Sequence, residues 1–149
     1  MRSALLIVFA TACSSDPAPT VEIVSASPEA LNPADDLADD LRIVATYEDG
    51  DGDLGEGTAR VHDCRADGLV TELEIPAIPG PDMIGSKITG SLELAINDVG
   101  ALTAAALPTT CADLGVTLEA GATVFCVELV DAAGNVGPGD CTKPITISP

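Results

Sequence analysis

The chain has 149 residues, which is enough for one domain with its own hydrophobic core. Its 24 acidic and 6 basic residues give a net charge of −18 at pH 7, and this charge argues against nucleic-acid binding, which requires clustered Lys and Arg. Hydrophobic residues make up 46% of the sequence, so a folded core is expected rather than disorder. Aromatic residues make up only 2%, which argues against a carbohydrate-binding module.

The first residues have the layout of an export signal. Arg2 precedes a short apolar run from Ala4 to Ala10, and small residues follow directly before Cys13. The apolar run is too short to span a membrane. Small residues before a cysteine resemble the cleavage site of bacterial lipoproteins. This resemblance implies that residues 1–12 are a signal peptide and that Cys13 becomes the lipidated first residue of the mature chain. A plain secretory signal with an incidental cysteine is the alternative.

Residues 13–20 are polar and contain proline, and we expect them to be a lipidated tether. From residue 21 to residue 149 the chain breaks into short β-type runs separated by Gly, Pro, Asn and Asp. This pattern predicts one all-β domain, an immunoglobulin-like β-sandwich of about seven strands. One or two helical turns are expected between residues 98 and 107. The expected strands are 21–27, 41–47, 59–64, 69–78, 84–96, 123–130 and 144–147.

Two polar loops are expected at the same end of this sandwich, since the second-to-third and sixth-to-seventh connections meet there in an immunoglobulin-like order. The first reads DGDGDLGEG over residues 49–57, and the second reads DAAGN over residues 131–135. Together with IPAIP over residues 75–79, these motifs resemble a group of small bacterial lipoproteins of unassigned function that carry immunoglobulin-like or fibronectin-like domains. The resemblance implies the fold and surface anchoring, and it implies no catalytic activity.

The first loop raises the question of calcium, because alternating Asp and Gly lets carboxylates converge on one ion. It is not an EF-hand, since Leu54 stands at the position of the loop Gly and Arg60 at the position of the final Glu. An ion would therefore need ligands from both loops. The alternative is a pair of polar turns that bind no ion. The candidate calcium ligands are Asp49, Asp51, Asp53, Glu56, Asp131 and Asn135.

The five cysteines are an odd number, and a lipid on Cys13 would leave four. Disulfides persist in the compartments that exported proteins reach, so two disulfides are expected. Four free buried thiols are the alternative. The remaining cysteines are Cys64, Cys111, Cys126 and Cys141.

The pairing of these cysteines depends on the last hairpin. If it closes at residues 131 and 136, Cys126 lies opposite Cys141. Cys64 would then pair with Cys111. The main competing pattern joins Cys111 to Cys126 and Cys64 to Cys141, and the sequence alone does not choose between them.

The sequence offers little catalytic chemistry. His62 is the only histidine, and no motif places a nucleophile or an orienting acid beside it, so we expect no enzyme. The predicted function is a non-enzymatic lipoprotein of the cell envelope, anchored in the outer membrane or at the cell surface through Cys13. Its immunoglobulin-like module would bind a protein partner or serve a structural role. The alternative is a periplasmic lipoprotein that captures a small ligand or a metal.

Overall fold

The structure is a computed structural model that describes residues 18–32, 40–65, 70–78, 85–97, 99, 110–111, 114–117 and 121–147. The expected signal peptide and Cys13 lie outside the described residues. No helix in these ranges is long and apolar enough to cross a bilayer. The strands are β1 (Thr20–Ser27), β2 (Ala30–Leu31), β3 (Leu41–Asp49), β4 (Thr58–Asp63), β5 (Val70–Glu74), β6 (Ile88–Ile96), β7 (Thr110–Cys111), β8 (Val116–Thr117), β9 (Ala122–Thr123), β10 (Phe125–Val130), β11 (Asp140–Cys141) and β12 (Ile145–Ile147).

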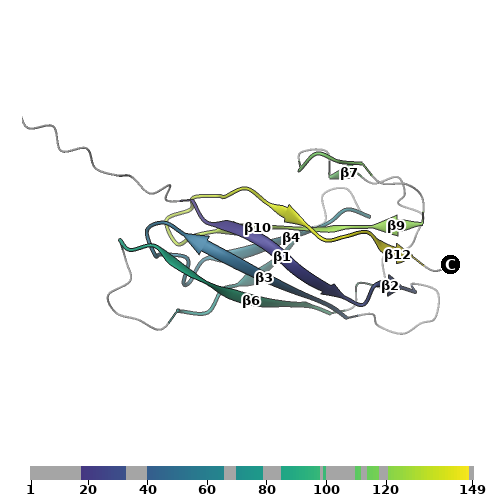
Figure 1. The fold of residues 1–149 in the computed structure, drawn as a ribbon, viewed down its shortest axis with the longest axis horizontal. Coiled ribbons are helices and arrows are strands. Elements are labelled where there is room, and N and C mark those ends of the chain that lie inside the picture. The colour runs from purple at the N-terminus through teal and green to yellow at the C-terminus, as the bar shows by residue number, and fades with distance from the viewer. Residues whose placement is uncertain are drawn as a thin grey trace, which may run out of the picture.

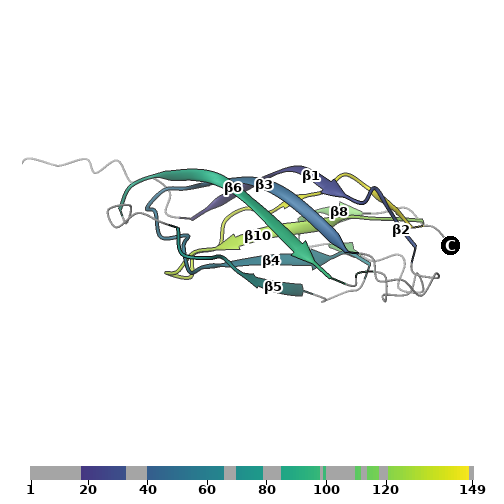
Figure 2. The same ribbon diagram turned by 90° about the horizontal axis from the view of Figure 1, so that it is seen from below.

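Two antiparallel sheets make up most of the described fold. One has the order β1-β3-β6, and the other has the order β11-β10-β4-β5. Figure 2 shows them as two layers, with β1, β3 and β6 on one side and β10, β4 and β5 on the other, and Figure 1 shows the β1-β3-β6 sheet in front. A small third sheet has the order β2-β12-β9, and β7 pairs with β8. The prediction of an all-β protein is confirmed.

One core lies between the two larger sheets, because their strands alternate between buried and exposed side chains. In β3, Leu41 and Ile43 are buried while Arg42 and Thr46 are exposed. The facing strand β4 buries Val61 in the same way. The core residues are Leu31, Leu41, Ile43, Leu54, Ala59, Val61, Ile75, Ile88, Leu94, Ile96, Val99, Phe125, Val127, Leu129 and Ile145.

The strand boundaries differ from the sequence prediction in ways that follow from backbone chemistry. β5 ends at Glu74, before Pro76, whose ring leaves no N–H for a ladder hydrogen bond. β6 begins at Ile88 rather than at residue 84. The helical turns expected between residues 98 and 107 fall on residues that the structure does not describe, apart from Val99.

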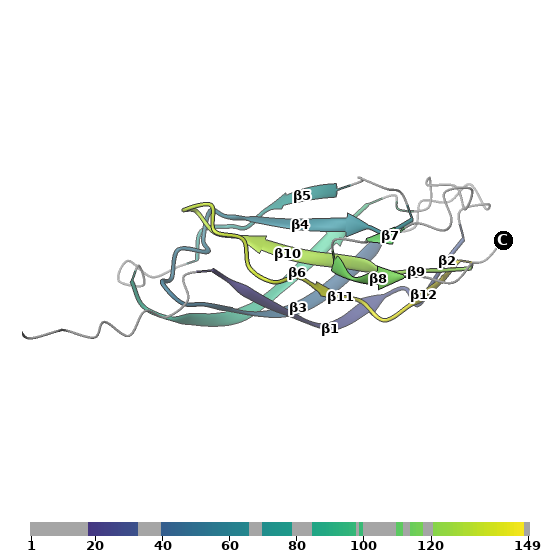
Figure 3. The ribbon, with the colours of Figure 1, turned by 90° about the horizontal axis from the view of Figure 1, so that it is seen from above.

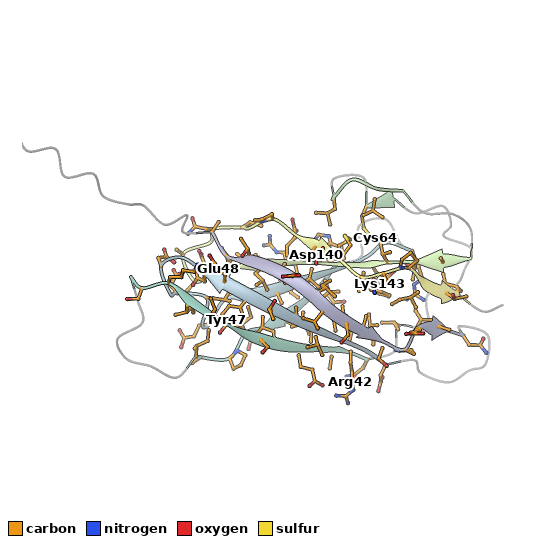
Figure 4. The ribbon with its side chains drawn as sticks, viewed as in Figure 1. Arg42, Tyr47, Glu48, Cys64, Asp140 and Lys143 are labelled. Carbon is orange, nitrogen blue, oxygen red and sulfur yellow. A yellow bond between two sulfur atoms is a disulfide. The ribbon has the colours of Figure 1, made fainter. Side chains whose placement is uncertain are left out.

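Asp140 connects the two sheets across a register slip in β1. The pairing of β1 with β3 shifts between Ile23 and Ser25, and the Ile23 N–H donates to Asp140 Oδ2 at 2.7 Å. Asp140 lies in β11, at the edge of the other sheet (Figure 4). Its carboxylate therefore satisfies a backbone donor beside the irregularity in β1.

Asp140→Ala is expected to lower the free energy of unfolding by about 1.5–3 kcal/mol, the usual value of a hydrogen bond to a charged group. Asp140→Asn is expected to lose less, because its amide oxygen still accepts from the Ile23 N–H. Equilibrium urea denaturation measures both losses. An Asp140→Ala variant as stable as the wild type would show that this contact contributes nothing.

Candidate cation site

Four carboxylates converge at one end of the fold, and we call them the aspartate cluster: Asp49, Asp51, Asp53 and Asp131. Each contributes one oxygen, and these oxygens all lie within 4.8 Å of one another. Asp49 and Asp131 are buried, with 0% and 4% of their surface exposed, while Asp51 and Asp53 are half-buried. Figure 3 shows the loop between β3 and β4 beside the loop that follows β10. The two loops thus meet at a single tip.

Asp49 is the last residue of β3, and its side chain points inward because of the strand's alternation. Its Oδ2 accepts a hydrogen bond from the Leu54 N–H at 2.9 Å. Leu54 is itself fully buried in the core. This bond folds the loop back over the carboxylate, and Gly52 permits the turn with a φ of 79°.

The two loops are held together by backbone contacts as well. The Ala132 N–H donates to the Asp53 carbonyl at 3.1 Å. At Gly57, an added Cβ would lie 2.2 Å from the Val130 carbonyl oxygen and 3.1 Å from the Asp131 Cα. Only glycine permits this close approach. Gly57 is the last residue of the DGDGDLGEG loop, and no role for it was predicted from the sequence.

Asn135 orients Asp131 within its own loop. Its backbone N–H donates to Asp131 Oδ1 at 2.7 Å, and its side-chain Nδ2 donates to Asp131 Oδ2 at 2.8 Å. These are the bonds expected of a turn that closes itself. They also hold the Asp131 carboxylate where it lies near the other three. Asn135 therefore acts on the aspartate cluster through Asp131.

Glu56 does not join the aspartate cluster. It is exposed, and its φ of 68° places it in the left-handed region, within a turn closed by the Gly57 N–H to the Leu54 carbonyl at 3.0 Å. Among the described residues, the group of close carboxylates contains only the four aspartates.

Three oxygens of the aspartate cluster are buried without a hydrogen-bond partner. They are the Oδ1 atoms of Asp49, Asp51 and Asp53. In the described part of the chain, no Lys or Arg forms an ion pair with the aspartate cluster. Buried polar atoms are normally satisfied, since leaving one unpaired costs free energy. A bound cation would provide a partner for buried carboxylate oxygens of this kind.

The raised pKa values of two residues in the aspartate cluster also favour a bound cation. The pKa of Asp53 is raised to about 6, mainly by burial and in addition by the contact with Asp51 and the charges of Asp131, Asp51 and Asp49. Burial also raises the pKa of Asp49, as does the charge of Asp51, while the hydrogen bond from the Leu54 N–H opposes the rise. Keeping these groups ionised near neutral pH is therefore unfavourable without a counter-charge.

The metal-free protein is expected to become more stable as the pH falls from 7.5 to 5. The folded pKa of Asp53, about 6, lies above its ordinary value of 3.8, so the folded state binds the proton more tightly than the unfolded chain. The ionised Asp53 carboxylate therefore lowers the stability of the folded state by its full amount above pH 6, and this loss decreases as the pH falls below 6. Melting temperatures in metal-free buffer measure the trend, which Asp53→Asn should weaken. A wild-type melting temperature that falls toward pH 5 would contradict it.

The structure contains two disulfides, Cys64–Cys111 and Cys126–Cys141. Cys126 lies opposite Cys141 in the pairing of β10 with β11. The hairpin closes one residue earlier than expected, with a bridge between Val130 and Val136 instead of residues 131 and 136. An irregularity between this bridge and the cysteines restores the register. The disulfides indicate a protein outside the cytoplasm.

His62 lies on the outer face of β4, and its Nε2 is 2.7 Å from Glu128 Oε2 on β10. Both side chains are partly exposed. The pair joins neighbouring strands, as cross-strand pairs commonly do.

Comparisons with protein-family models, curated proteins and solved structures each found no match. The functional conclusion therefore depends on the geometry of the aspartate cluster.

Proposed function

We propose that this protein is a non-enzymatic, lipid-anchored module of the bacterial cell envelope, stabilised by one calcium ion at the aspartate cluster. The observation that carries the proposal is the convergence of four carboxylates from two loops, three of them with a buried, unpartnered oxygen. Such oxygens need either a donor or a cation, and the described residues supply no cationic side chain.

Calcium fits this set of ligands better than other common cations. It takes six to eight hard oxygen ligands in a flexible cage, so four carboxylates leave room for backbone carbonyls and water. Magnesium demands a tighter octahedron and keeps most of its water. Zinc and copper prefer nitrogen or sulfur ligands, which the aspartate cluster lacks.

We also propose an immunoglobulin-like arrangement for the sandwich. The sheet orders β1-β3-β6 and β11-β10-β4-β5 support it, because each sheet combines strands distant in sequence. In that arrangement the aspartate cluster joins the connection between the second and third strands to the last hairpin. The bound ion would then hold the connection between the two sheets against the last hairpin, which belongs to the sheet β11-β10-β4-β5.

The position of the first described strand relates the proposed ion site to the proposed lipid anchor at Cys13. Thr20 pairs with Glu48, the neighbour of Asp49, and an added Cβ on Gly137 would meet the Pro19 carbonyl. The first described strand thus begins beside the tip. Cys13 precedes Pro19 by six residues, a reach of about 20 Å in an extended chain. The calcium loops would therefore lie at the membrane-facing end, leaving the opposite end for a protein partner.

Calorimetric titration of the protein with calcium tests the proposal. We expect one ion per chain, and we expect Asp53→Asn to weaken binding by about tenfold or more, equivalent to about 1.4 kcal/mol. Glu56→Gln is the matched control, because Glu56 belongs to the same loop but lies outside the aspartate cluster. A titration without heat, in a protein whose melting temperature is also unchanged by calcium, would refute the proposal.

A further inference from the structure

The two disulfides lie in contact with each other on the outer face of the sheet that contains β4 and β10. Cys64 Sγ is 3.8 Å from Cys126 Sγ, although these two cysteines belong to different disulfides. They lie with Val124 in a small apolar cluster, separate from the main core, against which Leu114 packs. Figure 4 shows Cys64 well away from Tyr47 and Glu48, which mark the tip with the aspartate cluster.

In each disulfide one cysteine is buried and the other is partly exposed. Cys64 and Cys126 expose 2% and 0% of their surface, whereas Cys111 and Cys141 are only partly buried. An external thiolate therefore reaches Cys111 or Cys141, and the buried partner becomes the leaving thiolate. That buried thiolate already touches a sulfur of the other disulfide.

We propose that the two disulfides form a single thiol–disulfide exchange site, whose substrate is an external thiol such as a small thiol or a cysteine of a partner protein. In the first step the external thiolate bonds to Cys111 Sγ, and the Cys64–Cys111 bond breaks to release the Cys64 thiolate. In the second step this thiolate bonds to Cys126 Sγ, and the Cys126–Cys141 bond breaks to release the Cys141 thiolate. Each step breaks one S–S bond and forms one, so no oxidant or reductant is consumed.

The same contact between Cys64 and Cys126 allows a second, mirror-image route that starts at Cys141. Attack on Cys141 releases Cys126, whose thiolate attacks Cys64 and releases Cys111. Both routes produce a disulfide between Cys64, which directly follows β4, and Cys126 in β10, and these two strands are paired in the structure. The rearranged protein keeps its sheet linked, while β7 loses its covalent bond to the end of β4. The exchange thus binds the external thiol to one partly exposed cysteine, Cys111 or Cys141, and releases the thiolate of the other.

Exchange with glutathione tests the proposal on the full-length wild-type chain. The protein is mixed with one equivalent of glutathione at pH 8, quenched with acid, alkylated and mapped by mass spectrometry. We expect glutathione on Cys111 with an alkylated Cys141, or the mirror image, together with a Cys64–Cys126 peptide. Alkylated Cys64 or Cys126 beside an intact second disulfide would overturn the proposal. A Cys111–Cys126 link would also overturn it, since Cys111 Sγ lies within 4.8 Å of Cys126 Sγ.

Single substitutions test the contact without an added thiol. Cys111→Ser leaves a thiol at Cys64, and we expect it to capture Cys126 and release Cys141. Cys141→Ser is expected to release Cys111 by the mirror reaction. Cys126→Ser is the control, because it removes the central acceptor and should leave the Cys64–Cys111 bond intact. Variants that keep their remaining native disulfide, with the thiol alkylated at Cys64 or Cys126, would contradict the proposed exchange.

Discussion

Calcium at 10 mM is expected to raise the melting temperature of this protein by about 4–11 °C relative to the metal-free state. Extracellular calcium modules bind with dissociation constants of about 0.1–1 mM. Calcium at 10 mM is about 10–100 times such a dissociation constant, so binding adds about 1.4–2.7 kcal/mol to the stability of the folded state. For a domain of this size, each kcal/mol corresponds to about 3–4 °C. Thermal melts in calcium and in chelator measure the shift.

Asp51→Asn sharpens this test, because it removes one charge at a half-buried position with little change in shape. We expect the variant to lose most of the calcium shift. In chelator it should be at least as stable as the wild type, since it removes repulsion within the aspartate cluster. Glu56→Gln should keep the full calcium-dependent rise in melting temperature. A wild-type shift that is equal in Asp51→Asn would mean that calcium acts elsewhere on the acidic surface.

Asp63→Ala is expected to lower the free energy of unfolding by about 3–5 kcal/mol, because it leaves a buried guanidinium without its counter-charge. Arg65 is fully buried, and its Nη2 donates to Asp63 Oδ2 at 2.7 Å. Its Nε donates to Asp63 Oδ1 at 3.1 Å, and its Nη2 also donates to the Val99 carbonyl. The guanidinium lies 5.6 Å from the centre of the Phe125 ring. Equilibrium urea denaturation measures the loss.

Glu72→Ala is the matched control for Asp63→Ala. Glu72 pairs with Arg60 on the outer face of the same sheet, where both side chains are exposed, so the expected loss is at most about 1 kcal/mol. The double variant Asp63→Leu/Arg65→Met should be more stable than Asp63→Ala alone, because no unpaired charge remains in the core. Equal losses in Asp63→Ala and Glu72→Ala would contradict this account of the buried pair.

The sequence predicted the all-β class because its runs alternate. Leu41, Ile43 and Ala45 lie two residues apart, and the structure buries them on one face of β3. The DGDGD loop and the DAAGN turn were expected at one end, and the structure brings Asp131 close to the aspartates of the first loop. Periodicity and turn chemistry are local properties, so a sequence expresses them directly.

Other features depended on contacts between distant residues, which local patterns do not report. Asp63 and Arg65 form a buried ion pair, although charged residues in a strand usually indicate an exposed face. Asn135 stays a predicted ligand of the ion, and the structure shows that it also donates two hydrogen bonds to Asp131. Another example is the register of the last hairpin, which differs by one residue between the Val130–Val136 bridge and the Cys126–Cys141 pair. Such an irregularity does not change the spacing of apolar residues, so the sequence pattern does not predict it.

The central claim is that one calcium ion binds between the two loops at the tip. Crystals grown in calcium, with anomalous diffraction data collected at long wavelength, test it most directly. We predict one anomalous peak within about 2.3–2.6 Å of carboxylate oxygens from Asp49, Asp51, Asp53 and Asp131. A calcium-soaked crystal with only water between these carboxylates, or with the ion bound elsewhere, would contradict the claim.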